Sequence, residues 1–355
     1  MTTPPAPVPR PAAAPVAPAP VAPTPAAPTP LAPAYDVLVL GEVLVEIHAD
    51  AALRDAADGT AARIAYSGDA LNAAAAAVAA GARTALLAVV GDDELSVPLL
   101  ERAAGLGVDI THVHRAPRPN GAYLLCADTR GEREFVYWRA HSAGSTLSPD
   151  HIASWHHLLT RSTALITSGI TGALSPSSRD AVVAAAEAVH RAGGHLSYDL
   201  NFRPRLTDRA AARALLARIA PLAGLLKTSC PADALALVGT ADPRAAADRC
   251  RRLGARAVAV TTGADALLLH DGATVTSLPV PANPAPVDAT GAGDCFMGTT
   301  TARLALGDSL GDAVAYGMAA ASLSVGARGG TGHVPAFTAT SALATAHRTA
   351  TVPGP

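Results

Sequence analysis

Val287-Asp-Ala-Thr-Gly-Ala-Gly-Asp-Cys-Phe296 carries more chemical information than any other segment of this chain. The run Gly291-Ala-Gly293 has almost no side chain, so its backbone N–H groups can approach an anion closely. Small apolar residues with helical character follow over 295–306, and the first turn of a helix favours negative charge. Asp294 adds a carboxylate beside the anion. The segment predicts an anion site with an adjacent base, as phosphoryl transfer requires, although a simple helix-capping turn would contain the same glycines.

The composition is typical of a globular α/β enzyme. The 355 residues are enough for one large α/β domain or two small ones, and half of them are apolar while 16% are charged. A formal net charge of −2 gives no reason to expect nucleic acid or a membrane as a partner. No run approaches the roughly 18 apolar residues of a membrane span. The four cysteines have neither metal spacing nor a paired framework, so we expect reduced thiols and a cytoplasmic location.

Three stretches of different composition divide the chain. Residues 1–34 repeat proline and alanine, with Arg10 as the only charged side chain. Proline blocks helix and sheet, so we expect a disordered tail there, inert rather than docked to a partner. Residues 35–336 carry the alternating patterns of one α/β domain. Residues 337–355 are expected to form a C-terminal tail, part of which could be helical.

Apolar strand runs alternate with helical segments through the central domain. Continuous apolar runs are typical of a parallel sheet that is covered on both faces. The runs lie at 36–41, 84–90, 163–167, 195–199 and 256–262. Ser175-Pro176 predicts the start of a helix, because serine caps helices and proline suits their first position. This helix is expected to run to Arg191. The expected fold class is α/β, with a doubly wound, mostly parallel sheet flanked by helices.

A β-hairpin, 121–127 and 134–139 around a turn at 129–132, stands outside this pattern. With the segment near 43–66, residues 117–141 predict a small β-sheet lid over a ligand. The lid concentrates aromatic residues next to an arginine: Tyr123, Tyr137, Trp138 and Arg139. Rings pack on the carbon faces of an oxygenated molecule, and a guanidinium binds a carboxylate in bidentate fashion. Alternatively, these rings only pack the lid and the arginine is solvated. An open lid edge favours pairing, so we expect a homo-oligomer through the lid.

Asp288-Ala-Thr-Gly-Ala-Gly-Asp294 resembles the signature of the ribokinase-like (PfkB-type) carbohydrate kinases, altered only at Ala289. Further motifs make residues 36–336 most similar to 2-keto-3-deoxygluconate kinases. They are Ser67-Gly-Asp-Ala-Leu-Asn72, Gly131-Glu-Arg-Glu-Phe-Val-Tyr-Trp-Arg139, Ser168-Gly-Ile-Thr-Gly-Ala-Leu-Ser-Pro176 and Asp199-Leu-Asn-Phe-Arg-Pro-Arg-Leu206. The resemblance implies transfer of a phosphoryl group from ATP to the primary hydroxyl of a sugar acid. It also implies Mg²⁺ as a cofactor, and a monovalent cation as a further option.

The resemblance assigns roles to individual residues. Asp294 is expected to accept the hydroxyl proton, while the N–H groups of Gly291, Ala292 and Gly293 stabilise the transferring group. The expected substrate-binding residues are Gly68, Asp69, Asn72, Tyr123, Tyr137, Arg139, Arg203 and Asp294. The expected nucleotide-binding residues are Asn201, Arg203, Thr261, Thr262, Gly263 and the 291–293 run. The loop 326–332 is expected to close over the adenine end.

One motif departs from the family pattern. Relatives usually have Asn-x-x-Glu after the next strand, near magnesium and phosphate, whereas this chain has Lys227-Thr-Ser-Cys-Pro-Ala-Asp233. Ser229 and Asp233 could substitute in part, so no metal-binding residue is assigned. Two alternatives follow. The first is the same chemistry on another sugar, such as fructose. The second is a non-catalytic nucleotide- or sugar-binding protein on the same fold, against which the intact Asp294 argues.

Overall fold

The computed structural model describes residues 1–3, 32–49, 53, 58–127 and 133–351. The chain separates after Ala32 into two units, and the described helices and strands lie in the second unit, which starts at Pro33. The N-terminal tail expected over residues 1–34 falls almost entirely outside the described residues. It therefore stays a prediction.

An eight-stranded sheet of order β14-β13-β12-β11-β10-β9-β1-β4 forms the centre of the second unit. Neighbouring strands from β4 to β12 are parallel, and β13 and β14 add an antiparallel hairpin at one edge. The strands are β1 (Val37–Leu40), β4 (Thr84–Leu87), β9 (Ala164–Ser168), β10 (His195–Asp199), β11 (Leu225–Ser229), β12 (Val258–Thr261), β13 (Ala266–His270) and β14 (Val275–Pro279). The predicted run at 84–90 is divided, because the chain leaves the sheet at Ala88. Val89–Gly91 (β5) then pairs with His114–Ala116 (β6).

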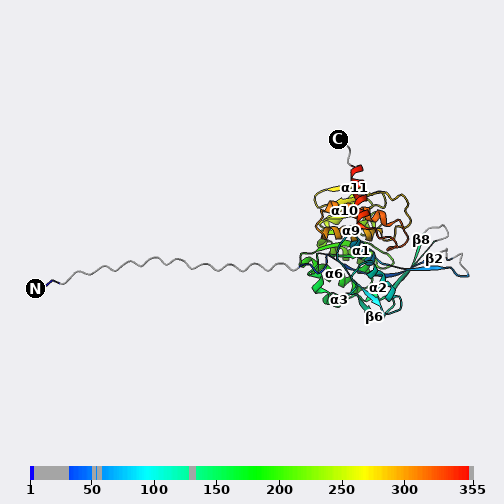
Figure 1. Cartoon of the computed structure of the whole chain (residues 1–355), viewed down its shortest axis with the longest axis horizontal. Helices are drawn as coiled ribbons and strands as arrows, with labels where there is room; N and C mark the ends of the chain where they lie inside the picture. The colour runs from blue at the N-terminus through cyan, green and yellow to red at the C-terminus, as the bar shows by residue number, and fades with distance from the viewer. Residues whose placement is uncertain (4–31, 50–52, 54–57, 128–132, 352–355) are drawn as a thin grey trace. The chain divides into compact units, whose positions relative to one another are not determined.

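Helices cover both faces of this sheet, as the fold class predicts. Leu38 and Leu40 of β1 pack in one hydrophobic core with α6, whereas Val37 and Val39 pack in another with α1. The helices are α1 (Asp69–Ala79), α2 (Ser96–Gly105), α3 (Pro149–Ser154), α4 (His156–Leu159), α5 (Gly169–Ala173), α6 (Pro176–Arg191), α7 (Arg209–Ile219), α8 (Pro243–Arg252), α9 (Ala292–Ala305), α10 (Leu310–Ser324) and α11 (Phe337–Thr351), with short turns at Ala143–Thr146, Ala220–Leu222 and Ala234–Val238. Figure 1 shows α1, α9 and α10 grouped together, apart from α3 and α6. The doubly wound α/β prediction is confirmed.

Local sequence explains where α6 begins and ends. The Ser175 hydroxyl accepts a hydrogen bond from the Ser178 N–H at 3.0 Å, and the Ser178 hydroxyl accepts one from the Ser175 N–H at 2.8 Å. This reciprocal cap satisfies N–H groups that have no partner inside the helix, with Pro176 in the first position. The helix ends at Arg191, as the sequence predicts.

A separate four-stranded sheet, of order β3-β2-β7-β8, lies beside the main sheet. Its strands are β2 (Leu44–Ala49), β3 (Ala62–Ser67), β7 (Gly121–Ala127) and β8 (Arg133–Trp138). The predicted hairpin is therefore present as β7 and β8, while its turn at 129–132 lies outside the described residues. Figure 1 shows β2 and β8 extending away from the helices. On one face of this sheet the rings of Tyr123, Phe135 and Tyr137 contact one another.

The C-terminal segment differs from the tail expected over residues 337–355. Phe337–Thr351 form α11, which packs against α10. The Phe337 ring lies 5.2 Å from the Tyr316 ring, centroid to centroid, and Arg348 pairs with Asp312. The alanine- and threonine-rich sequence gave a weak apolar pattern, yet Ala344 is buried against its neighbours. Among the described residues, the helices are too short or too polar to cross a membrane.

Candidate active site

A cavity of about 550 Å³ opens where the carboxyl ends of β10, β11 and β12 meet the start of α9 and the inner face of the small sheet. In parallel α/β sheets this edge is where ligands bind. Most of the residues predicted to bind substrate or nucleotide line this cavity. They are Gly68, Asp69, Asn72, Tyr123, Tyr137, Arg139, Asn201, Arg203, Thr261, Gly263, Gly291, Gly293 and Asp294. Thr262 and Ala292 lie outside its lining. The Thr262 hydroxyl donates to the Ala266 carbonyl at 2.7 Å, which closes a turn.

The glycine-containing run 291–293, for which the sequence predicts an anion site, lies at the N-terminus of α9. Gly291 has φ +78° and ψ −2°, a left-handed conformation that favours glycine. A Cβ at this position would also lie 2.9 Å from the Cα of Gly330. The N–H of Ala292 donates to the Ala289 carbonyl at 3.2 Å, so this predicted donor already has a partner. The first helical turn beside it supplies the positive end of the helix dipole.

Asp294 lies in the first turn of α9 and accepts a hydrogen bond from the Asn72 side chain at 2.9 Å. Burial in the protein raises the pKa of this carboxyl group to about 7, and the neighbouring Asp69 carboxylate also raises the pKa. A group with a pKa near 7 exchanges protons readily at neutral pH. Asp294 is therefore positioned as a general base beside an anion site would be, and both roles stay predictions.

Lys227 was not identified from the sequence. Its ammonium lies 2.8 Å from the Asp199 carboxylate, and both side chains are buried. The two residues pair directly across the parallel strands β10 and β11, so the fold itself places them together. A lysine that directly follows two leucines in the buried strand β11 was the available signal.

Asp233 holds the loops together instead of pointing into open space. One oxygen accepts the Phe202 N–H at 3.0 Å, and the other accepts the Ser229 hydroxyl at 2.8 Å. These bonds connect the segments that follow β10 and β11. Among the described residues, no group of three or more His, Cys, Asp or Glu side chains could hold a metal. One oxygen of Asp199 is buried without a hydrogen-bond partner, as is one oxygen of Asp69, so the cavity has two carboxylates that suit a water-bound Mg²⁺.

Arg139 is buried and forms an ion pair with Glu42, which follows β1. The alternative of a solvated arginine is therefore wrong, and the guanidinium is not fully available to a ligand. Its Nε atom is buried without a hydrogen-bond partner, and its Cζ atom lies 5.4 Å from the centre of the Tyr137 ring. Burial raises the pKa of Glu42, and the charge of Arg139 opposes that rise. Arg203, in contrast, is an exposed cation at the cavity wall.

A second, smaller cavity of about 160 Å³ shares Thr261, Gly263 and Gly293 with the main one. Its remaining walls are apolar: Ala266, Leu267, Val280, Ala292, Phe296, Met318 and Ala321. A narrow cavity with such walls fits a flat ring and offers it few hydrogen bonds. The loop 326–332 does not line it. Gly330 packs against Asn72 and Gly291, and the Gly329 N–H donates to Asp288 at 2.9 Å, so this loop lies against the start of α9. Its expected role over the adenine end stays a prediction.

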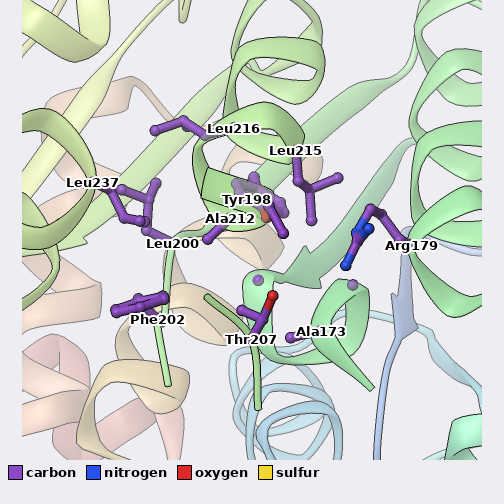
Figure 2. Close-up of a pocket in the computed structure, with 13 residues that line it drawn as sticks. Ala173, Arg179, Tyr198, Leu200, Phe202, Thr207, Ala212, Leu215, Leu216 and Leu237 are labelled. Atoms are coloured by element: carbon purple, nitrogen blue, oxygen red, sulfur yellow. The ribbon is translucent and has the colours of Figure 1, made fainter. Parts of the chain in front are cut away.

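A third crevice, drawn in Figure 2, lies against β10 and α7 and is not a ligand site. Leu200, Leu215 and Leu237 crowd around it together with Tyr198. The free space is about 10 Å³, which is at the lower limit for one water molecule. It is therefore a packing defect beneath the strand that carries Asp199.

The fold and the site together define a kinase that phosphorylates a small hydroxyl compound. Residues 35–336 match the model of the pfkB family of carbohydrate kinases, and the chain belongs to this family. It is therefore a phosphotransferase that uses an alcohol group as acceptor. The resemblance that the sequence motifs predict is confirmed at the level of the family.

Individual relatives extend over most of the chain. A 2-dehydro-3-deoxygluconokinase from Thermoproteus tenax is 33% identical over 308 residues, which cover 82% of this chain and 89% of the relative. A fructokinase from Klebsiella pneumoniae is 30% identical over 239 residues, covering 63% and 72%. An E. coli protein named ribokinase II, solved in complex with ATP and Mg²⁺, superposes with a TM-score of 0.78 at 25% identity and covers 89% of this chain and 100% of that one.

Proposed function

We propose that this sugar kinase transfers the γ-phosphoryl group of ATP to the primary hydroxyl of 2-keto-3-deoxygluconate, which yields the 6-phosphate. The observation that carries the proposal is the cavity in which Asp294 and the α9 N-terminus face two tyrosines and two arginines. The similarity to the Thermoproteus tenax 2-dehydro-3-deoxygluconokinase supports the choice of sugar. Incubation with ATP and the sugar acid should give a product whose mass and ³¹P spectrum identify a 6-phosphate. A product phosphorylated elsewhere, or no product, would contradict it.

The transfer follows from the positions of the residues. The substrate hydroxyl oxygen attacks the γ-phosphorus while Asp294 takes the hydroxyl proton. A bond forms between that oxygen and phosphorus, and the bond to the bridging oxygen of ADP breaks, so ADP leaves with the bonding electrons. The N–H groups of Gly291 and Gly293 at the start of α9 stabilise the charge on the transferring group. The apolar slot bounded by Leu267 and Phe296 would hold the adenine ring.

We propose Mg²⁺ as the cofactor, with Asp199 as its protein carboxylate through water. Mg²⁺ keeps several waters and prefers one or two carboxylates together with substrate phosphates, and one unpartnered oxygen of Asp199 fits that preference. When bound, the ion neutralises charge on the phosphates. A monovalent cation remains a further expectation from the family resemblance.

Cys230, Cys250 and Cys295 are buried thiols, which supports a reducing, cytoplasmic location.

Arg203 is the arginine that we expect to select a sugar acid over a neutral sugar. Replacing Arg203 with leucine should remove a charge-assisted hydrogen bond to the substrate carboxylate, worth about 1.5–3 kcal/mol, or roughly a 10- to 150-fold rise in KM for the acid. The KM for any neutral sugar should not change. Steady-state kinetics with both substrates measure the difference. Arg209→Leu, at an exposed arginine that starts α7, is the matched control; equal effects of the two variants would contradict the assignment.

Fructose is the second candidate, because the Klebsiella pneumoniae fructokinase is also similar to this chain. Its chemistry would use the same base and the same anion site. A neutral ketose has no carboxylate, however, and would leave Arg203 without a partner at the cavity wall. Preference for fructose, with kinetics insensitive to Arg203, would favour this candidate. A binding protein without catalysis would show no ADP formation with any sugar.

We propose that the small sheet also mediates a homo-oligomer. Trp138 and Ile64 point away from the face that carries Tyr123, and they are 54% and 52% exposed. Exposed apolar side chains on one sheet face favour burial against a second copy. Light scattering of the purified protein should give the mass of a dimer. A monomer mass at micromolar concentration would contradict this proposal.

A further inference from the structure

Two positive groups converge at the start of α9. A Cβ built on Gly293 would lie 2.8 Å from the Nζ atom of Lys227 and 3.3 Å from its Cε atom, so the ammonium lies directly against the Gly293 backbone. The first turn of a helix carries a partial positive charge. A buried ammonium at that point is unfavourable unless anions neutralise both charges. The place therefore suits a strongly anionic ligand, and the side chain of any residue larger than glycine at 293 would displace the ammonium.

Asp199 holds the ammonium there. The Lys227 ammonium donates to one Asp199 oxygen at 2.8 Å, and the side chains are only 8% and 5% exposed. An ammonium has three donors, and the ion pair with Asp199 uses one of them. The lysine is thus charged and fixed in position before any ligand arrives.

The composition of the chain points to a specific need for lysine at this position. Lys227 is the only lysine in the 355 residues; all of the other side chains counted as Lys or Arg are arginines. An ammonium is a compact point charge, whereas a guanidinium is a broad planar fork. The Lys227 ammonium occupies the narrow space between Asp199 and the Gly293 backbone. Arginine serves at every other basic position of this chain, so a lysine at position 227 indicates a requirement beyond positive charge.

We propose that Lys227 is a catalytic residue that contacts the phosphoryl group during its transfer, and that Asp199 is its positioning residue. The inference rests on the proposed ATP-dependent transfer but not on the identity of the sugar. While the bond to the ADP oxygen breaks and the bond to the sugar oxygen forms, negative charge spreads over the other three phosphoryl oxygens. The Lys227 ammonium stabilises that charge together with the α9 N-terminus. Lys227 thereby supplies positive charge from β11. The family resemblance places Asn-x-x-Glu in this part of the chain.

Kinetics of Lys227→Met test the catalytic role. Loss of a preorganised charge at the reacting group should lower kcat by on the order of 10²–10³-fold, with the KM for the sugar within about 3-fold, since the ammonium acts mainly on the transition state. Lys227→Arg should retain more kcat than the methionine variant, because it keeps the charge. A folded Lys227→Met variant with kcat within about 3-fold of the wild type would overturn the proposal. Such a result would leave the kinase function intact.

The double variant Lys227→Met/Asp199→Asn covers the case in which the single variant does not fold. It replaces the pair with neutral side chains of similar size, so no unpaired charge stays buried. Because Asp199 is also the proposed carboxylate for Mg²⁺, Asp199→Asn alone, which keeps the ammonium, is the reference, and the double variant should lose a further factor of about 10- to 100-fold in kcat. Equal kcat of the Asp199→Asn and double variants would overturn the proposal. Whichever sugar the wild type phosphorylates serves as the substrate. A failure with 2-keto-3-deoxygluconate alone therefore rejects only the proposed substrate.

A single lysine also allows a readout that requires no turnover. Lysine labelled with ¹⁵N at the side chain should give one ammonium resonance in the full chain. ADP with Mg²⁺ and aluminium fluoride, which mimics the planar phosphoryl group, should shift and sharpen this resonance, whereas ADP with Mg²⁺ alone should have a smaller effect. A purely structural ion pair would not distinguish the two additions. An identical resonance in both complexes, with binding verified by calorimetry, would overturn the proposal.

Discussion

Replacing Asp294 with asparagine is expected to lower kcat by about 10²- to 10⁴-fold, the usual contribution of a general base. The amide keeps the size of the side chain and can still contact Asn72, but it cannot accept the hydroxyl proton. The affinity for ATP should remain within a few-fold of the wild type, because Asp294 faces the acceptor hydroxyl. A coupled assay of ADP formation measures kcat, and calorimetry measures the ATP affinity.

Asp180→Asn is the matched control, since Asp180 is exposed on α6. The pH dependence gives a second readout of the same base. The pKa of Asp294 is about 7, and only the ionised form accepts a proton, so kcat of the wild type should fall about tenfold per unit as the pH drops below that value. Near-normal turnover of Asp294→Asn, or a rate independent of pH between 5 and 8, would remove Asp294 from the role of base.

Replacing Arg139 with leucine is expected to lower the free energy of unfolding by about 3–5 kcal/mol. The reason is Glu42, which would remain buried without its partner. Burial already raises the pKa of Glu42, so a protonated Glu42 would reduce the penalty at low pH, and the loss should grow as the pH rises. Urea denaturation at several pH values measures it. The further replacement of Glu42 by leucine should recover much of the stability.

Arg191→Leu is the control for this prediction. Arg191 pairs with Glu187 at 3.5 Å on the same helix, and the two side chains are 66% and 42% exposed. Exposed pairs of this kind contribute about 0.3–0.5 kcal/mol. If both arginine variants lost equally little, Arg139 would not be held by a buried ion pair. Its position would then be explained by substrate binding alone, as the Tyr-Trp-Arg motif suggests on its own.

Local signals made much of the fold predictable. The serine cap and proline at Ser175-Pro176 define the start of α6, and continuous apolar runs such as 36–41 define buried parallel strands. The position of Gly291 and Asp294 at a helix N-terminus was predictable because the two residues lie within one turn of helix. In each case the decisive interactions lie within a few residues of one another, so the sequence contains the whole pattern.

Contacts between distant segments escaped prediction. The pairing of Glu42 with Arg139 joins β1 to the end of the small sheet, and a sequence pattern does not reveal which carboxylate a buried arginine meets. Lys227 meets Asp199 only because β10 and β11 are neighbours in register. The loop 326–332 reaches Asn72 across the fold. Helix α11 gave no clear periodicity, because alanine and threonine provide little contrast between its faces.

The central claim is that this pfkB-family kinase phosphorylates a sugar acid with Asp294 as its base. The most direct test compares kcat/KM for 2-keto-3-deoxygluconate and fructose in the same ADP-formation assay, with the wild type and Asp294→Asn side by side. We predict a preference for the acid of at least about 100-fold, as expected for a site built around a charged contact, and loss of both activities in the variant. Equal or greater efficiency with fructose, or ADP formation that persists without Asp294, would contradict the claim.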